Sequence, residues 1–222
     1  MRPLNGHPLI LYTLAAALDS EVFSQICVAT DDPAIVALTD EPTTIFLHRR
    51  APVADDQPDI EWVREVLAAH SCDDSFAILR PTSPFRTAAM IRRAYRDFMG
   101  LGRECSSLRA VEPVKQTPYK MWIPTMAGYM LPLLPASWEG VPLHSMPTQR
   151  HPMVWIQNSS LEMAWVTTVT EQGTIAGKTV YPFFTDGYEG FAIDTEEDWT
   201  QAERLARDHP ELLPMVEAIQ HG

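Results

Sequence analysis

The chain has 222 residues, of which 45% are hydrophobic and 21% are charged, a composition that suits a globular protein with a sizeable buried core. With 17 Lys and Arg residues against 29 Asp and Glu residues, the formal net charge is -12. Because an acidic surface repels phosphate backbones and anionic lipid head groups, neither nucleic acid nor a membrane is expected as a main partner.

Apolar runs and helical patterns alternate through the first half of the chain. The spacing predicts helices over 8–18, 33–38, 59–70 and 87–99, and strands over 25–30, 44–48, 75–79 and 106–114. Strands and helices that alternate at this spacing indicate βαβ units and a mainly parallel sheet. We therefore expect one α/β domain, residues 1–222, whose ligands bind beyond the carboxyl ends of the strands.

The second half is richer in proline, and its predicted elements are shorter. The sequence predicts a hairpin over 119–124 and 128–134, an irregular stretch over 135–152, a strand over 161–168, and helices over 195–207 and 210–220. A long irregular stretch in a compact domain is typical of a lid, a binding loop or an oligomerisation arm.

Two further signals concern the protein's compartment. No apolar run reaches the roughly 18 residues that a membrane span needs, and the first seven residues lack the basic and then apolar pattern of a secretory signal. Cys27, Cys72 and Cys105 are too widely spaced for a zinc motif or a disulfide framework. We therefore expect a cytoplasmic protein.

The segment LRPTSPFRT at 79–87 is the first candidate site. It joins a predicted strand to a predicted helix, and its prolines stiffen the backbone. The hydroxyl groups and Arg86 would then face a crevice beside a helix N-terminus, which favours anions. A rigid turn that carries a surface arginine explains the same pattern, and both interpretations stay open.

The segment GFAIDTEEDW at 190–199 is the second candidate. Asp194 comes at the end of an extended stretch, just before a predicted helix. With Glu197 three residues later it fits a capping box. It equally fits a Mg²⁺ ligand, because Mg²⁺ at nucleotide sites often binds only one or two carboxylates besides phosphates and water.

A third candidate is the basic set Arg49, Arg50 and Lys120. Each of these residues alone is typical of a solvated surface charge. In so acidic a protein, basic residues at predicted strand ends also suit the binding of phosphate groups.

Six segments in this order resemble the acylneuraminate cytidylyltransferase family, the CMP-sialic acid synthetases: RPLNGHPLI at 2–10, VATDD at 28–32, LRPTSPFRT at 79–87, PYK at 118–120, QNSS at 157–160 and IDTEEDW at 193–199. The resemblance implies a Rossmann-like three-layer nucleotidyltransferase fold with a small β-rich dimerisation arm at about 118–155. It implies an enzyme that uses Mg²⁺ to transfer CMP from CTP to a nonulosonic, sialic-type sugar acid, with release of pyrophosphate. It also implies a homodimer.

The resemblance also assigns roles to residues. Asp194 and Lys120 would be catalytic, and Asp194 would hold the metal. The residues implied at the nucleotide are Asn5, Arg50, Asp55 and Asp56. The residues implied at the sugar are Arg80, Ser83, Arg86, Gln149 and Asn158.

The sequence departs from the family pattern in several places. It begins just after the position of the family's first strand and phosphate-binding loop, so we expect the chain to lack both. Ala192 stands where the family has its first metal-site aspartate, and Arg80 replaces a commonly uncharged glutamine. Ser159 and Ser160 replace a Gly-Ala pair, which adds bulk at the sugar side.

These departures keep an alternative open: a catalytically impaired relative that acts as a binding module or a dimer scaffold. A nucleotidyltransferase for another sugar acid, such as Kdo, or for a sugar phosphate is a further alternative.

Overall fold

A computed structural model describes residues 2–39, 45–49, 57–70 and 74–216. The chain forms two compact units, one from Met1–Val111 with Asn158–Gly222 and the other from Glu112–Gln157. The second unit contains the whole of the predicted arm, 118–155.

The predicted elements of the first half are confirmed, each to within two residues at either end. The helices are α1 (Leu9–Ser20), α2 (Pro33–Thr39), α3 (Asp59–Ala69) and α4 (Ala88–Leu101). The strands between and after them are β3 (Ile26–Thr30), β4 (Ile45–Arg49), β5 (Ser75–Ile78) and β6 (Ser107–Pro113). Before α1, β1 (Pro3–Leu4) and β2 (His7–Pro8) pair as a short antiparallel hairpin.

The second half of the first unit differs more from the prediction. Strand β11 (Trp155–Trp165) begins six residues before the predicted strand and gives way to α5 (Val166–Thr170), and β12 (Val180–Phe184) was not predicted. Helix α6 (Glu196–Asp208) is confirmed, but the predicted helix over 210–220 is wrong in its described part, where a single 3-10 turn, Pro210–Leu212, forms. Leu213 is extended because the proline that follows it disfavours a helical backbone.

Four strands form the larger sheet, in the order β12-β6-β11-β5. β12 runs parallel to β6, with Val180 opposite Ser107, whereas β11 runs antiparallel to β5, with Glu162 opposite Ile78. β3 and β4 form a separate parallel pair. The larger sheet is therefore mixed, where the sequence predicted a mainly parallel one.

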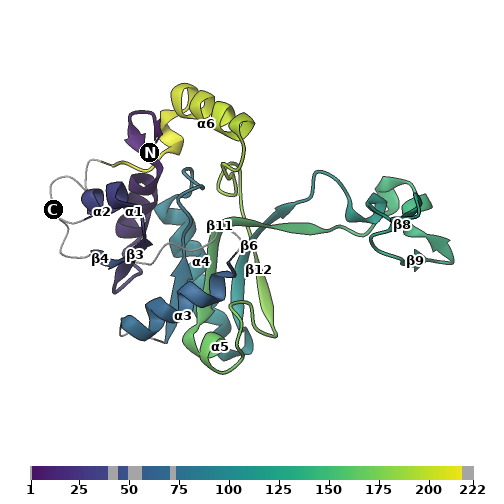
Figure 1. Ribbon diagram of the computed structural model, residues 1–222, viewed down its shortest axis with the longest axis horizontal. Coiled ribbons are helices and arrows are strands. Elements are labelled where there is room, and N and C mark those ends of the chain that lie inside the picture. The colour runs from purple at the N-terminus through teal and green to yellow at the C-terminus, as the bar shows by residue number, and fades with distance from the viewer. Residues whose placement is uncertain (1, 40–44, 50–56, 71–73, 217–222) are drawn as a thin grey trace. The chain divides into compact units, whose positions relative to one another are not determined.

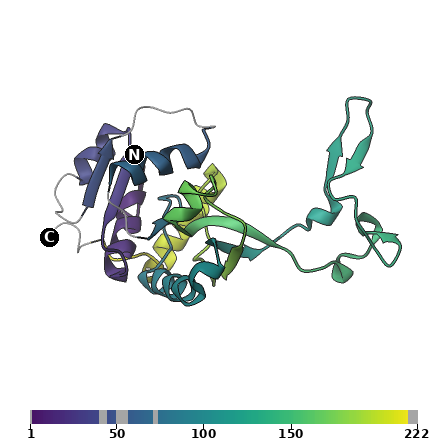
Figure 2. The same ribbon diagram turned by 90° about the horizontal axis from the view of Figure 1, so that it is seen from below.

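Alternating side chains of the larger sheet point to two helical layers. Leu108, Leu161 and Met163 pack with Met90 and Phe98 of α4. On the opposite face, a smaller apolar cluster joins α3 and α5 to β5 through the side chains of Val63, Val169 and Ile78. Figure 1 shows α3 and α5 on one side of this sheet, and Figure 2 shows the same elements from below.

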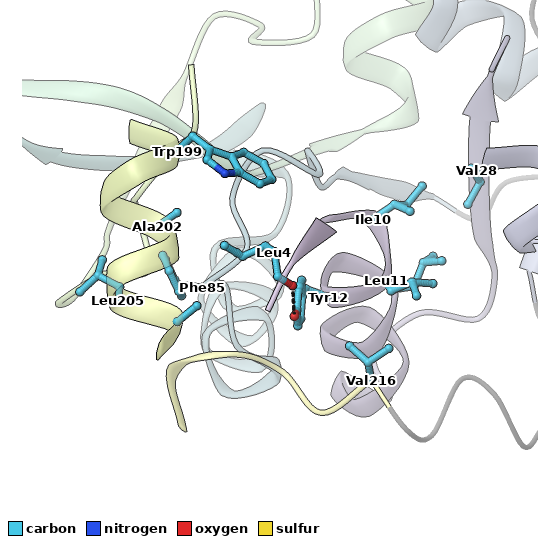
Figure 3. Packing of buried hydrophobic residues seen from close by; sticks show 12 residues of the cluster. Leu4, Ile10, Leu11, Tyr12, Val28, Phe85, Trp199, Ala202, Leu205 and Val216 are labelled. Atoms are coloured by element: carbon cyan, nitrogen blue, oxygen red, sulfur yellow. Dashed lines mark hydrogen bonds between the residues drawn. The ribbon is translucent and has the colours of Figure 1, made fainter. Parts of the chain in front are cut away.

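The second large cluster surrounds α1. This helix carries few charges, and most of its side chains are buried. Figure 3 shows Trp199 of α6, Phe85 and Leu4 converging beside this helix, with the Tyr12 hydroxyl donating to the Leu4 carbonyl at 2.7 Å. Burying one large apolar side chain stabilises a fold by about 1.5–3 kcal/mol. In the described part of the chain, no helix is both long enough and apolar enough to cross a membrane.

The second unit has little core of its own. It contains the hairpin of β7 (Trp122–Pro124) and β8 (Met130–Pro132) and the short pair β9 (Ser137–Trp138) and β10 (Val141–Pro142). Within residues 112–157, all of which are described, only Leu143 and Met146 are buried.

Candidate functional site

The loop between β5 and α4 is largely buried. Thr87 caps α4 by accepting a 3.1 Å hydrogen bond from the amide of Met90. Just before it, Ser83, Phe85 and Arg86 are each at most 2% exposed. The interpretation of this segment as a turn with a surface arginine is therefore wrong.

Arg86 is a buried cation that binds backbone groups. Its guanidinium donates to the carbonyl of Ser160, to the Thr13 hydroxyl at 2.8 Å and to the carbonyl of Arg80 at 3.3 Å. Among the described residues no carboxylate pairs with it, and burial lowers the pKa of Arg86 to about 9. Arg86 thus ties α1, the β5–α4 loop and β11 together, whereas the predicted contact with a substrate would need an exposed side chain.

The acidic segment lies against this same loop. The amide of Ile193 donates a 2.9 Å hydrogen bond to the carbonyl of Thr82. The next residue, Asp194, is exposed, and its carboxylate has no hydrogen bond or ion pair within the described ranges. Asp194 therefore stands free beside the loop that Arg86 fixes.

The predicted capping box is displaced by one residue. Thr195 accepts from the amide of Asp198 at 3.2 Å, and the Asp198 carboxylate accepts from the amide of Thr195 at 2.8 Å. Asp194 and Glu197 are thus not the capping pair. Because Thr195 and Asp198 cap α6, the side chain of Asp194 is left available for another partner.

Asn158 supports the loop from the side of β11. Its amide nitrogen donates to the Thr185 hydroxyl at 3.1 Å, and its amide oxygen accepts from the Ser160 hydroxyl at 2.6 Å. Ser160 in turn presents its carbonyl to Arg86. Ser83 is also buried, and its hydroxyl has no partner among the described residues.

Arg80 belongs to an ionic network on the α3 side of the sheet. Its guanidinium lies 2.5 Å from the Asp59 carboxylate and 3.3 Å from that of Glu162, which also pairs with Arg109. Burial alone would raise the pKa of Asp59, but the hydrogen bonds from Arg80 and Trp62 and the charge of Arg80 hold it below its usual value. Burial, followed by the charge of Arg80, lowers the pKa of Arg109.

A cavity of about 280 Å³ adjoins this network. Asp59 and Arg109 line it together with the loop 173–176. Sequence reasoning missed Arg109 and Glu162, although each stands between two apolar residues of a strand. This alternation could have identified them. In a strand, neighbouring residues point to opposite faces of the sheet, so a charged residue between two apolar ones points away from the layer that its neighbours face.

The remaining predicted residues belong to other parts of the chain. Asn5 is exposed in the turn between β1 and β2, with a backbone φ of 44°. Arg50, Asp55 and Asp56 lie outside the described residues. Lys120 and Gln149 are exposed residues of the second unit.

Asp194 fits a Mg²⁺ ion that has few protein ligands. Within the described ranges, no three His, Cys, Asp or Glu side chains are grouped so that they could hold a metal. A free, exposed carboxylate is nevertheless the donor that Mg²⁺ uses when substrate phosphates and water complete its shell.

The chain is similar to proteins that are named as cytidylyltransferases or CMP-sugar-acid synthases. A family model described as cytidylyltransferase matches residues 1–103. N-acylneuraminate cytidylyltransferase of Escherichia coli O18:K1:H7 is 36% identical over 95 residues, which are 42% of this chain and 23% of that protein. CMP-N,N'-diacetyllegionaminic acid synthase of Legionella pneumophila is 26% identical over 219 residues, 96% of this chain and 90% of that protein.

Solved structures show the same architecture. CMP:2-keto-3-deoxy-manno-octonic acid synthetase, complexed with CTP, has a TM-score of 0.65 and 12% identity over 93% of this chain and 90% of its own. 4-Diphosphocytidyl-2C-methyl-D-erythritol synthase from Anaerococcus prevotii has a TM-score of 0.60 and 13% identity over 92% of this chain and 91% of its own. At these identities the likeness shows the α/β fold.

Proposed function

We propose that the chain is a cytidylyltransferase that transfers CMP from CTP to a nonulosonic sugar acid and releases pyrophosphate, because a cytidylyltransferase family model matches residues 1–103 and both curated relatives have cytidylyl-transfer names. The relatives from Escherichia coli and Legionella pneumophila are both named for joining a cytidylyl group to a sugar acid. The Legionella protein gives the stronger support for a sugar-acid substrate, because its match spans nearly the whole chain.

The observation that carries the proposal is the hydrogen bond between Ile193 and Thr82. It brings Asp194 beside the β5–α4 loop and so joins two of the six segments on which the family resemblance rests. A shared site requires this juxtaposition, because both reactants must be oriented before the sugar hydroxyl attacks the α-phosphorus.

Each group has a defined task in the proposed reaction. Asp194 would hold Mg²⁺, which when bound neutralises charge on the phosphates. Arg86 holds the backbone of the loop at the Arg80 carbonyl, and Asn158 bonds Ser160, whose carbonyl accepts from Arg86, so that the polar groups of the loop are oriented before the substrates arrive. Arg80 carries a planar guanidinium of the kind that suits a sugar carboxylate, but it is already paired with Asp59 and Glu162, so binding the sugar would require it to leave one of these partners.

We further propose that a second copy of the chain covers the second unit. Large apolar side chains of this unit that are at least half exposed include Ile123, Met126, Tyr129, Met130, Leu131, Trp138, Met153 and Ile156. The second unit buries only two of its own residues, so it leaves these side chains exposed to solvent. Exposed apolar surface of this kind is typical of an interaction site. A second copy of the chain presents the same apolar surface, so that each second unit can bury the apolar side chains of the other in a symmetric contact.

Ala192 favours a second candidate function. It stands where the resemblance puts the first metal-site aspartate, so that of this pair only Asp194 remains to hold a metal. A chain that binds CTP without turning it over would be a binding module or a dimer scaffold.

Pyrophosphate release separates the two functions. The chain is incubated with CTP, Mg²⁺ and, one at a time, sialic, legionaminic and pseudaminic acids and Kdo, and CTP binding is measured in parallel. Turnover with at least one of the first three acids is expected. CTP binding without turnover on any acid would support the binding module, and the absence of both would contradict both candidates.

A further inference from the structure

Two histidines, one on β4 and one at the end of α3, lie close together in the first unit; Figure 1 labels both elements. Nδ1 of His48 on β4 lies 3.3 Å from Nε2 of His70, which follows the last residue of α3. The other nitrogen of His48, Nε2, lies 3.2 Å from the carboxylate of Glu65 on α3. The side chain of His48 is only 13% exposed.

The carboxylate determines which nitrogen of His48 carries the proton. An ionised carboxylate only accepts hydrogen bonds, so Nε2 of His48 must donate to Glu65. In the neutral ring, Nδ1 then holds a lone pair aimed at His70. This is the arrangement in which a carboxylate orients a metal-binding imidazole through its outer nitrogen.

The separation of the two facing nitrogens suits a tetrahedral metal ion. Zn–N bonds of about 2.0–2.1 Å at a tetrahedral angle place two ligand nitrogens roughly 3.3 Å apart. A direct hydrogen bond at the same place would be longer than the usual range. The spacing of the two nitrogens is thus already that of two ligands on one ion.

We propose that His48 and His70 chelate a borderline transition-metal dication such as Zn²⁺, with Glu65 as the residue that orients His48. Without metal, Nε2–H of His70 donates to Nδ1 of His48. When the ion binds, the ring proton of His70 moves from Nε2 to Nδ1 of the same ring, and Nε2 of His70 binds the ion. Both rings stay neutral. Among the described residues, no third His, Cys, Asp or Glu side chain is grouped with these two to hold a metal. Mg²⁺, which prefers oxygen ligands, is excluded by this chemistry.

Metal titration of the full chain tests the proposal independently of the transferase activity. After treatment with chelator, Zn²⁺ is titrated against a competing fluorescent indicator, and a long-range ¹H–¹⁵N spectrum identifies the metal-bound imidazole nitrogens. One Zn²⁺ per chain is expected to bind through Nδ1 of His48 and Nε2 of His70, and to raise the melting temperature. Mg²⁺ should leave the imidazole signals of both histidines unchanged.

Variants separate this site from adventitious binding. H48A and H70A should each lose this one equivalent of Zn²⁺, and E65A should weaken it by about tenfold. His209→Ala is the matched control, because His209 also lies 3.2 Å from a carboxylate, that of Glu211, with no second imidazole recorded beside it within the described ranges. Circular dichroism in chelator confirms that each variant folds. Unchanged affinity in H48A and H70A, or binding through the opposite ring nitrogens, would overturn the proposal.

Discussion

The amide of Ile193 and the carbonyl of Thr82 are joined by a hydrogen bond of 2.9 Å, although they are far apart in the sequence. The bond holds the segment before α6 against the loop after β5. Asp194 is the next residue, so its position depends on the position of this loop. The buried guanidinium of Arg86 in turn fixes this loop by donating to the Arg80 carbonyl. A buried cation therefore supports the position of the exposed residue Asp194.

Replacing Asp194 by asparagine should lower turnover by roughly 100-fold, the order of loss that follows removal of one group that stabilises developing charge. The Mg²⁺ concentration needed for half-maximal rate should rise as well, because the neutral amide attracts the ion less. Glu197→Gln is the matched control, because Glu197 is an exposed carboxylate on the first turn of the same helix. If both variants lose activity equally, Asp194 has no special role.

The elements of the first half could be predicted because local patterns decide them. Asp32 before Pro33, Thr87 before α4 and the apolar stripe of α3 each mark a boundary or a face within a few residues. The later elements depend on contacts that no local window contains. β12, for example, pairs in parallel with β6, far away in the sequence.

The candidate site, too, could be predicted only in part from the sequence. The sequence indicated the two segments, and it left Asp194 open between a cap of α6 and a Mg²⁺ ligand, whereas Thr195 makes the cap. It also treated Arg86 as a surface or substrate-binding group, because nothing in the sequence shows that carbonyl groups of Ser160 and Arg80 would surround it. Burial of a charge is decided by the tertiary fold, which brings together acceptors from distant segments.

Arg86→Met should lower the free energy of unfolding by about 2 kcal/mol. The apolar side chain leaves the carbonyl groups of Ser160 and Arg80 without their donor, at a cost of roughly 1–3 kcal/mol for each buried group, and relief of the buried charge offsets part of this. Denaturant unfolding measures the change. Arg92→Met is the control, since Arg92 lies on the exposed face of α4 and also donates to a carbonyl group; its effect should stay within about 0.5 kcal/mol. Equal effects would contradict the buried role of Arg86.

The lowered pKa of Arg86 predicts a pH dependence of stability. Burial holds its pKa at about 9 in the folded chain, below that of the unfolded chain. Above pH 9 the folded state therefore binds fewer protons than the unfolded state, and the contribution of Arg86 to stability increases as the pH rises. The difference in unfolding free energy between wild type and R86M should grow in favour of the wild type from pH 8 to pH 10.5. A constant difference across this range would show that Arg86 keeps an ordinary pKa.

Charges placed on the second unit should abolish the proposed dimer. Ile123 and Leu131 face each other across the β7–β8 hairpin and are 50% and 59% exposed. Ile123→Glu with Leu131→Glu would bring like charges into a contact between copies, where a buried unpaired charge is strongly unfavourable. Sedimentation velocity should show a dimer for the wild type and a monomer for the double variant. Met215→Glu, which replaces an exposed methionine of the first unit, should remain dimeric. A wild-type chain that stays monomeric at all concentrations would instead mean that its apolar surface serves another partner.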